Sequence, residues 1–273
     1  MSKRAPHRWR PAAINLMIVA ALMSVLSFLP PDTSLSDRQR SGVLKLCVPQ
    51  SFPPLVTGDP NAPGYDVELA GAVAEALGLR LTVNVLPSIG RDYNPRNWSL
   101  TRAQCDVVGG GVADTPQTRS FMQTIPTQAR TGWVGISRTG ALPPEGQTIA
   151  VLPGTSGMDR LALSGWLRQQ RLRAQAVRGP AELNQALQSG AAAAAITERF
   201  VAAGLDLDPS AFQMFWLEGD TFASFPMALG VWKGDQTLSR AVGAALAELE
   251  SSGALEHMRE RYGVGSDLGA NRS

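Results

Sequence analysis

The hydrophobic pattern between residues 64 and 86 changes from helical to strand spacing within a few positions. Apolar side chains first recur every three or four residues, which predicts an amphipathic helix with Asp66 as its cap and Gly78 at its left-handed end. The residues of this stripe are Val67, Ala70, Val73, Ala74 and Leu77. From Leu79 onward apolar and polar residues alternate, as they do in a strand. With the apolar run VLKLCV at 43–48 upstream, the pattern predicts one strand, helix and strand unit.

The same alternation of strands and helices continues along the chain. A predicted strand at 106–108 ends in three glycines, and a second series begins after residue 144. We expect strands at 148–152 and 228–232, a strand in the alanine run that ends at Glu198, and helices in the intervening segments and after residue 235. Such alternation predicts an α/β fold in which mostly parallel sheets are flanked by helices.

The N-terminal segment has the pattern of a targeting sequence. Basic residues precede an apolar stretch at 12–29, and Pro30 and Pro31 then stop any helix. Residues 1–31 are therefore predicted to be a signal peptide or an N-terminal membrane anchor. The stretch of 18 residues is longer than a usual signal core and just long enough to span a bilayer, and no small-x-small cleavage site stands out. Both interpretations place the globular part outside the cytoplasm.

The charge of the chain is concentrated in this leader. Four of the 25 basic residues and none of the 23 acidic residues precede residue 32, so the remainder carries 21 basic and 23 acidic residues, a net charge of −2. The basic pI therefore gives no reason to expect nucleic acid as a partner. About 240 residues remain, which is enough for one large domain or two lobes.

The reactive side chains exclude several classes of site. His257 is the only histidine after the leader, so histidine-based triads and multi-histidine metal sites lack their components, and we predict no metal and no cofactor. In an exported protein, the even count of Cys47 and Cys105 favours a disulfide, which two neighbouring strands could bring within reach. Buried cysteine can also be simply a small hydrophobic residue, so both possibilities stay open.

Five segments, in order, resemble the family 3 periplasmic solute-binding proteins of ABC transporters. They read GYDVELAGAVAEALG, CDVVGGGVADTPQTR, VLPGTSG, ALQSGAAAAAITE and VWKGD followed by LSRAVGAALAELESSGALEHMRERYG. The resemblance covers residues 43–263 and implies the type II periplasmic-binding-protein fold, two α/β lobes joined by two hinge strands. It implies a linker at 32–42, lobe 1 at 43–136 plus 232–265, lobe 2 at 137–231, hinges near 135–137 and 228–230, and a flexible tail at 266–273.

The resemblance also implies a function. A periplasmic protein of this kind captures a small amino-acid-like or carboxylated solute in the cleft between its lobes and presents it to an inner-membrane ABC permease, without being an enzyme. A retained leader would anchor it to the inner membrane through residues 12–29. The implied ligand-binding residues are Phe52, Gly111, Thr115, Arg119, Thr155, Ser156 and Glu198. Arg119 stands near the family's carboxylate-binding arginine, and Glu198 at the acid that takes the amino group.

Several positions depart from the family's pattern. The segment Gly111–Arg119 has one extra residue, Ala113 replaces a threonine, and Pro49 and Ala193 stand where acids are common. Arg119 can therefore also be interpreted as a solvated surface residue, and Glu198 as the partner of Arg199 in a local ion pair.

Two alternative functions follow from these departures. The segments LKLCV and NPRNWSLTRAQCDVV look like binding-protein relatives that are encoded with methanol-type quinoprotein dehydrogenases, whose partner would be a periplasmic dehydrogenase or cytochrome c. Cyclohexadienyl dehydratases resemble the same receptors and use a carboxylate in the cleft, for which Glu198 or Asp114 would be the candidate base.

Overall fold

The computed structural model describes residues 9–27, 31–90, 94–153, 158–217, 222 and 224–265. The chain divides into two compact units, Met1–Thr33 and Ser34–Ser273. The first contains helix α1 (Trp9–Ser27). Within the ranges just given, none of the helices combines the length and the apolar character that crossing a membrane requires. The predicted tail at 266–273 and the predicted turn at 154–157 lie outside the described residues.

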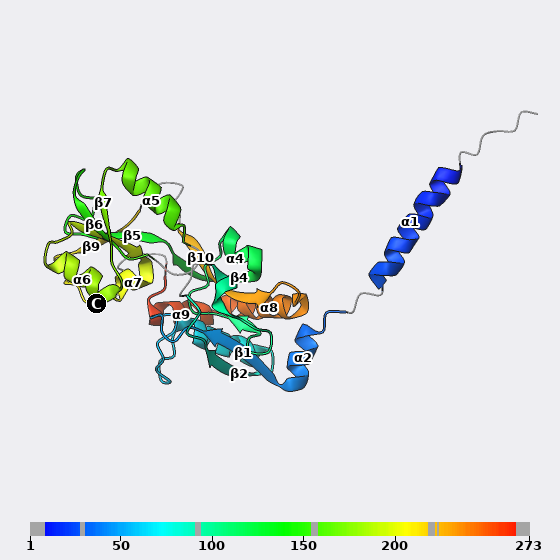
Figure 1. The fold of residues 1–273 in the computed structure, drawn as a ribbon. Helices are drawn as coiled ribbons and strands as arrows, with labels where there is room; N and C mark the ends of the chain where they lie inside the picture. Colours follow the sequence, from blue (N-terminus) through cyan, green and yellow to red (C-terminus); the bar gives the residue numbers. More distant parts are fainter. Residues whose placement is uncertain are drawn as a thin grey trace, which may run out of the picture. The chain divides into compact units, whose positions relative to one another are not determined.

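The second unit contains two sheets of five strands, each with its own helices (Figure 1). The first sheet has the order β2-β1-β3-β10-β4, where β1 pairs parallel with β2 and β3 and β10 pairs antiparallel with β3 and β4. Its strands are β1 (Val43–Val48), β2 (Arg80–Val85), β3 (Val107–Val108), β4 (Met122–Thr131) and β10 (Phe225–Trp232). Its helical segments are α3 (Tyr65–Ala76), η1 (Pro95–Trp98), α4 (Pro116–Phe121), α8 (Gln236–Ser251) and α9 (Ala254–Tyr262).

The second sheet has the order β7-β6-β8-β5-β9, with parallel pairing of β6 to β7 and β8 and antiparallel pairing of β5 to β8 and β9. Its strands are β5 (Trp133–Ser137), β6 (Thr148–Val151), β7 (Arg173–Ala176), β8 (Ala194–Glu198) and β9 (Gln213–Trp216). Helices α5 (Arg160–Gln169), α6 (Pro180–Gln188) and α7 (Arg199–Ala203) belong to the same part of the chain. The predicted α/β class, including the strand in the alanine run, is confirmed. The expected mostly parallel pairing is wrong, because β10 in the first sheet and β5 in the second each pair antiparallel with both neighbours and make the sheets mixed.

The predicted strand, helix and strand unit at 43–86 is confirmed as β1, α3 and β2, with one difference at the start of the helix. Gly64 is the N-cap, and Asp66 lies inside the first turn, where it is fully buried. A β-carbon at Gly64 would lie 2.4 Å from the carbonyl oxygen of Leu55, so only glycine fits there. Gly78 has the predicted left-handed conformation, with a φ of 69°.

The chain passes between the two sheets at other positions than the expected hinges. Gly132 alone separates β4 of the first sheet from β5 of the second, and the return path lies between β9 and β10. The expected hinges at 135–137 and 228–230 lie inside β5 and β10. Their glycines serve close packing instead: a β-carbon would lie 2.2 Å from the Phe215 ring at Gly135 and 2.1 Å from Met122 Sδ at Gly230.

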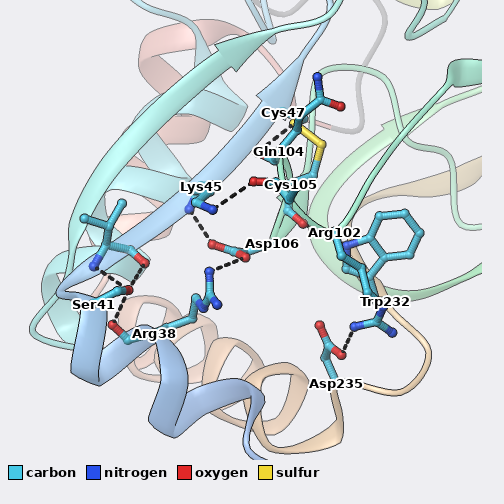
Figure 2. Close-up of polar contacts among 12 residues, drawn as sticks. Arg38, Ser41, Lys45, Cys47, Arg102, Gln104, Cys105, Asp106, Trp232 and Asp235 are labelled. Atoms are coloured by element: carbon cyan, nitrogen blue, oxygen red, sulfur yellow. Dashed lines mark hydrogen bonds and ion pairs between the residues drawn. A yellow bond between two sulfur atoms is a disulfide. The ribbon is translucent and has the colours of Figure 1, made fainter.

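Most of the expected linker at 32–42 is helix α2 (Ser34–Ser41), which packs onto the first sheet and α8. Figure 2 shows Arg38 and the backbone amide of Lys45 both directed at the carboxylate of Asp106, at 2.9 Å each. The Ser34 and Thr237 hydroxyls lie 3.0 Å apart. The sequence SLSDRQRS has no apolar stripe, and therefore gave no helical signal.

Candidate functional site

A disulfide joins β1 to the segment that leads into β3. Cys47 and Cys105 are bonded and fully buried, with 5.4 Å between their Cα atoms (Figure 2). The Cys105 carbonyl also accepts a hydrogen bond from the Trp232 indole at 2.8 Å. Of the two possibilities that the sequence left open, the structure has the disulfide.

A cavity opens beside the end of β1. Its volume is about 230 Å³, and the turn after β1, the turn after β2 and the glycine triplet line it. The lining residues are Pro49, Gln50, Ser51, Phe52, Pro87, Ile89, Gly90 and Gly110. Because strand ends and glycine turns meet here, backbone groups and an aromatic ring line this space.

Phe52 connects this cavity with the second sheet. A β-carbon at Gly111, whose φ is 109°, would lie 3.2 Å from two carbons of the Phe52 ring, so the ring lies directly against the glycine backbone. On another side, the ring meets Phe200 of α7 edge to face, with 6.4 Å between centroids. The structure thus brings together two predicted site residues, Phe52 and Gly111, and places them next to the helix that Glu198 caps.

Glu198 is buried at the junction of β8 and α7. One of its oxygens accepts hydrogen bonds from the amides of Phe200 and Val201 at 2.9 and 3.0 Å, and the other accepts one from the Thr131 hydroxyl of β4. Burial raises the pKa of this carboxyl, which these hydrogen bonds and the Arg199 guanidinium partly offset. Both oxygens already have donors, so a ligand ammonium group would have to share or replace one of them.

Arg199 follows Glu198 and is a buried cation that the sequence did not single out as a structural residue. Its guanidinium donates to the carbonyl of Arg130 at 2.7 Å and lies over the rings of Phe200 and Trp216, at 5.0 and 5.8 Å from their centroids. Together with the Thr131–Glu198 hydrogen bond, this contact ties consecutive residues of β4 to consecutive residues at the start of α7.

Arg119 is placed differently from what the resemblance implied. Its side chain is 52% exposed on α4 and forms an ion pair with Asp114 at 2.9 Å. The fully buried residue of this turn is Thr118, whose amide is capped by the Thr115 side chain at 3.3 Å. Thr118 therefore faces the buried side of α4, and Arg119, the next residue, faces solvent. Thr155 and Ser156 lie outside the described residues.

Asp66 is a residue near the cavity that the sequence analysis treated only as a helix cap. Its Oδ2 accepts a hydrogen bond from the amide of Gly110 at 2.6 Å. Burial raises its pKa from 3.8 to about 7, against the lowering effect of the Gly110 and Gly111 amides. A buried carboxylate that faces a glycine turn could have been suspected from the helix stripe, because Asp66 precedes its apolar residues by one position, but the partner turn lies over 40 residues away in sequence.

Comparison with known proteins gives a consistent family. Residues 44–265 match the model of the bacterial extracellular solute-binding proteins, family 3. The L-cystine-binding protein TcyJ of Escherichia coli (strain K12) is 26% identical over 284 residues, which cover 96% of this chain and 98% of that protein.

Solved structures share the two-lobed fold. An ancestral cationic amino acid solute-binding protein, AncCDT-1, aligns with a TM-score of 0.63 and 18% identity over 84% of this chain and 99% of that chain. A substrate-binding protein of an ABC uptake transporter from Streptococcus pneumoniae, with bound histidine, aligns with a TM-score of 0.62 and 17% identity over 86% and 99%. At these identities the likeness shows the fold. These comparisons do not support the expected dehydrogenase or cytochrome c partner.

Proposed function

Because the chain belongs to family 3 of the bacterial extracellular solute-binding proteins, we propose that it is an exported protein that binds a small amino-acid-like or carboxylated solute for uptake by an ABC permease. The observation that carries this proposal is the family match over residues 44–265, together with the cavity beside Phe52. Neither the family match nor the described helices support anchoring to the membrane through residues 12–29.

The proposed solute site lies where the two sheets meet at the Phe52–Phe200 contact. Phe52 and the backbone of Gly111 form its wall on the first sheet, and Glu198 is its acid on the second. Thr115 supports this wall by capping α4, whereas Arg119 takes part only if a solute carboxylate replaces Asp114. Thr155 and Ser156 remain predicted contacts from the resemblance. Solute that binds both sheets would favour a closed arrangement of two lobes that move about Gly132, between β4 and β5.

Binding is favoured over catalysis by the state of the two candidate bases. Glu198 accepts hydrogen bonds on both oxygens, and Asp114 Oδ1 accepts two, from Arg119 and from the Thr124 hydroxyl. A general base needs a free acceptor within reach of the proton that it removes. The dehydratase alternative is tested by adding prephenate and arogenate to the binding assay below, and turnover of either would contradict the proposal.

The test is a thermal-shift panel of the twenty amino acids, L-cystine and short dicarboxylates. A solute present at about 10 to 1,000 times its Kd should stabilise the protein by about 1 to 4 kcal/mol. Phe52→Ala should abolish the shift, because the aromatic wall of the site is lost. Phe212→Ala, which removes a similarly half-buried ring in the second sheet's own core, should leave the shift in place. No shift with any member of the panel would contradict the proposed function.

A further inference from the structure

The carboxylate of Asp66 holds the turn at Gly110 and Gly111, which borders the solute cavity. Asp66 is fully buried in the first turn of α3, and its Oδ2 accepts the Gly110 amide at 2.6 Å. Gly110 lines the cavity, and its neighbour Gly111 lies against the ring of Phe52. The position of the Asp66 carboxylate therefore affects the shape of the cavity through Gly110 and Gly111.

Neighbouring side chains pack closely against the turn at Gly110. A β-carbon at Gly110 would lie 2.4 Å from Pro49 Cδ and 2.7 Å from Val56 Cγ2. Both glycines have positive φ angles, 74° and 109°, which they adopt readily but which also leave them many other conformations. Contacts from outside the turn therefore fix its conformation, and the Asp66 carboxylate is one of them, together with the Cys47 carbonyl, which accepts from the Gly109 amide at 2.9 Å.

The turn that carries Phe52 depends on the same helix start. The amides of Tyr65 and Asp66 donate to the carbonyls of Pro54 and Leu55 at 3.0 and 3.1 Å, and these residues belong to the turn that carries Phe52. Thus the backbone of Asp66 holds the Phe52 turn while its side chain holds the glycine turn. Helix α3 therefore supports both the Phe52 turn and the glycine turn that line the cavity.

Stability alone does not account for a carboxylate at this position. Asp66 Oδ1 is buried without a hydrogen-bond partner among the described residues, which is costly for a charged group. Burial also raises the pKa of Asp66 to about 7, so the folded protein disfavours the ionised form. The ionised carboxylate is therefore held at a cost to the fold, which the hydrogen bond from the Gly110 amide partly offsets.

We infer that Asp66 is a positioning residue of the solute site, whose carboxylate fixes the Gly110–Gly111 turn and thereby the ring of Phe52 against which the solute binds. The inference rests on the proposed function for the identity of the site. A charge-assisted hydrogen bond is roughly twice as strong as a neutral one, so the carboxylate holds the turn more firmly than an amide side chain of the same shape.

The test uses Asp66→Asn in the full chain at pH 7.5, with the panel member that gives wild type its largest thermal shift as the probe. We expect affinity to fall about tenfold, which is the difference between a charge-assisted and a neutral hydrogen bond. We expect the unfolding midpoint without solute to stay within about 3 °C of wild type or to rise. Hydrogen exchange at residues 109–112 should become faster without solute.

The matched control is Asp106→Asn. Asp106 is also a buried carboxylate of the first sheet that accepts a backbone amide, but its partners are Lys45 and Arg38 on the far side from Phe52. This variant should lose stability and keep its affinity, the opposite of Asp66→Asn. Unchanged affinity in Asp66→Asn, or a midpoint that falls as in the control, would overturn the inference.

The outcome distinguishes this inference from the proposed function. If wild type binds no member of the panel, the proposed function fails, and unchanged hydrogen exchange at 109–112 in Asp66→Asn would still refute the role of the carboxylate in fixing the turn. If wild type binds and the variant binds equally well, only the inference fails.

Discussion

Two buried carboxylates with raised pKa values have different surroundings. Glu198 has donors on both oxygens and links β4 to α7, whereas Asp66 has a donor on Oδ2 and none on Oδ1 within the described part of the chain. The pKa is raised in both carboxylates, although both oxygens of Glu198 have donors and only one oxygen of Asp66 does within the described part of the chain. At the residue scale, the hydrogen-bond partners therefore distinguish these two carboxylates, whereas the direction of the pKa shift is the same for both.

The raised pKa of Asp66 predicts a pH dependence of stability. Below pH 3.8 the carboxyl is protonated in both the folded and unfolded states, and between 3.8 and about 7 the folded state holds a proton that the unfolded state has lost. The free energy of unfolding of wild type, minus that of Asp66→Asn, should therefore fall by about 1 kcal/mol per pH unit from pH 4 to 7 and be constant above. Denaturant unfolding at several pH values measures this difference.

The pKa of Glu198 is raised as well, but Glu198 is present in both wild type and Asp66→Asn. The difference between the two proteins therefore reports on Asp66 alone. A difference that does not change between pH 4 and 7 would mean that Asp66 is already ionised in the folded protein throughout this range.

Single residues were predictable where a short motif decides their role. The cysteine pair is bonded, as one of the two interpretations of the cysteine count expected, and the solute contact of Phe52 stays a prediction. Arg119 was not predictable, because one extra residue in the loop decides whether Thr118 or Arg119 faces the buried side of α4. Neither was the role of Asp66, because its partner glycine comes from a distant turn.

At the element scale, the first sheet is cross-linked around β1. The disulfide joins residues that are 58 positions apart in sequence. The segment between them contains α3, β2 and the turns after β1 and β2. A cross-link of this span restricts the unfolded chain, which is the main source of its stabilisation in the chain-entropy model.

Replacing both cysteines by alanine should lower the free energy of unfolding by about 2 to 4 kcal/mol. Solute affinity should change little at temperatures where the variant is folded, because neither cysteine lines the cavity. Denaturant unfolding together with calorimetric titration measures both quantities. A loss of affinity without loss of stability would contradict this account and would place the disulfide in the solute site.

Elements were predictable to the extent that hydrophobic periodicity marks them. The 3.6-residue stripe of α3 and the alternation in β2 identify both, and the order of the segments predicts the α/β class. Helix α2 has no apolar stripe, and contacts such as Arg38–Asp106 hold it. The expected hinge segments lie inside β5 and β10, where Gly135 and Gly230 pack closely against Phe215 and Met122, and their part in lobe movement stays a prediction.

At the scale of the whole Ser34–Ser273 unit, the two sheets meet through a small set of contacts. Among the described residues these contacts include the Phe52–Phe200 ring contact, the Thr131–Glu198 hydrogen bond and the Arg199–Arg130 hydrogen bond. The family's segment order predicts such a two-part architecture. The identity of the solute is not predictable from it, because discrimination between similar solutes depends on the placement of a few side chains.

The central claim is that one solute binds both sheets and draws them together, and small-angle X-ray scattering tests it most directly. Data should be collected on the protein alone and with the panel member that gives the largest thermal shift, at saturation. The account predicts a smaller radius of gyration with solute, and loss of this decrease in Phe52→Ala. A solute that stabilises the protein and leaves the radius of gyration unchanged would contradict it.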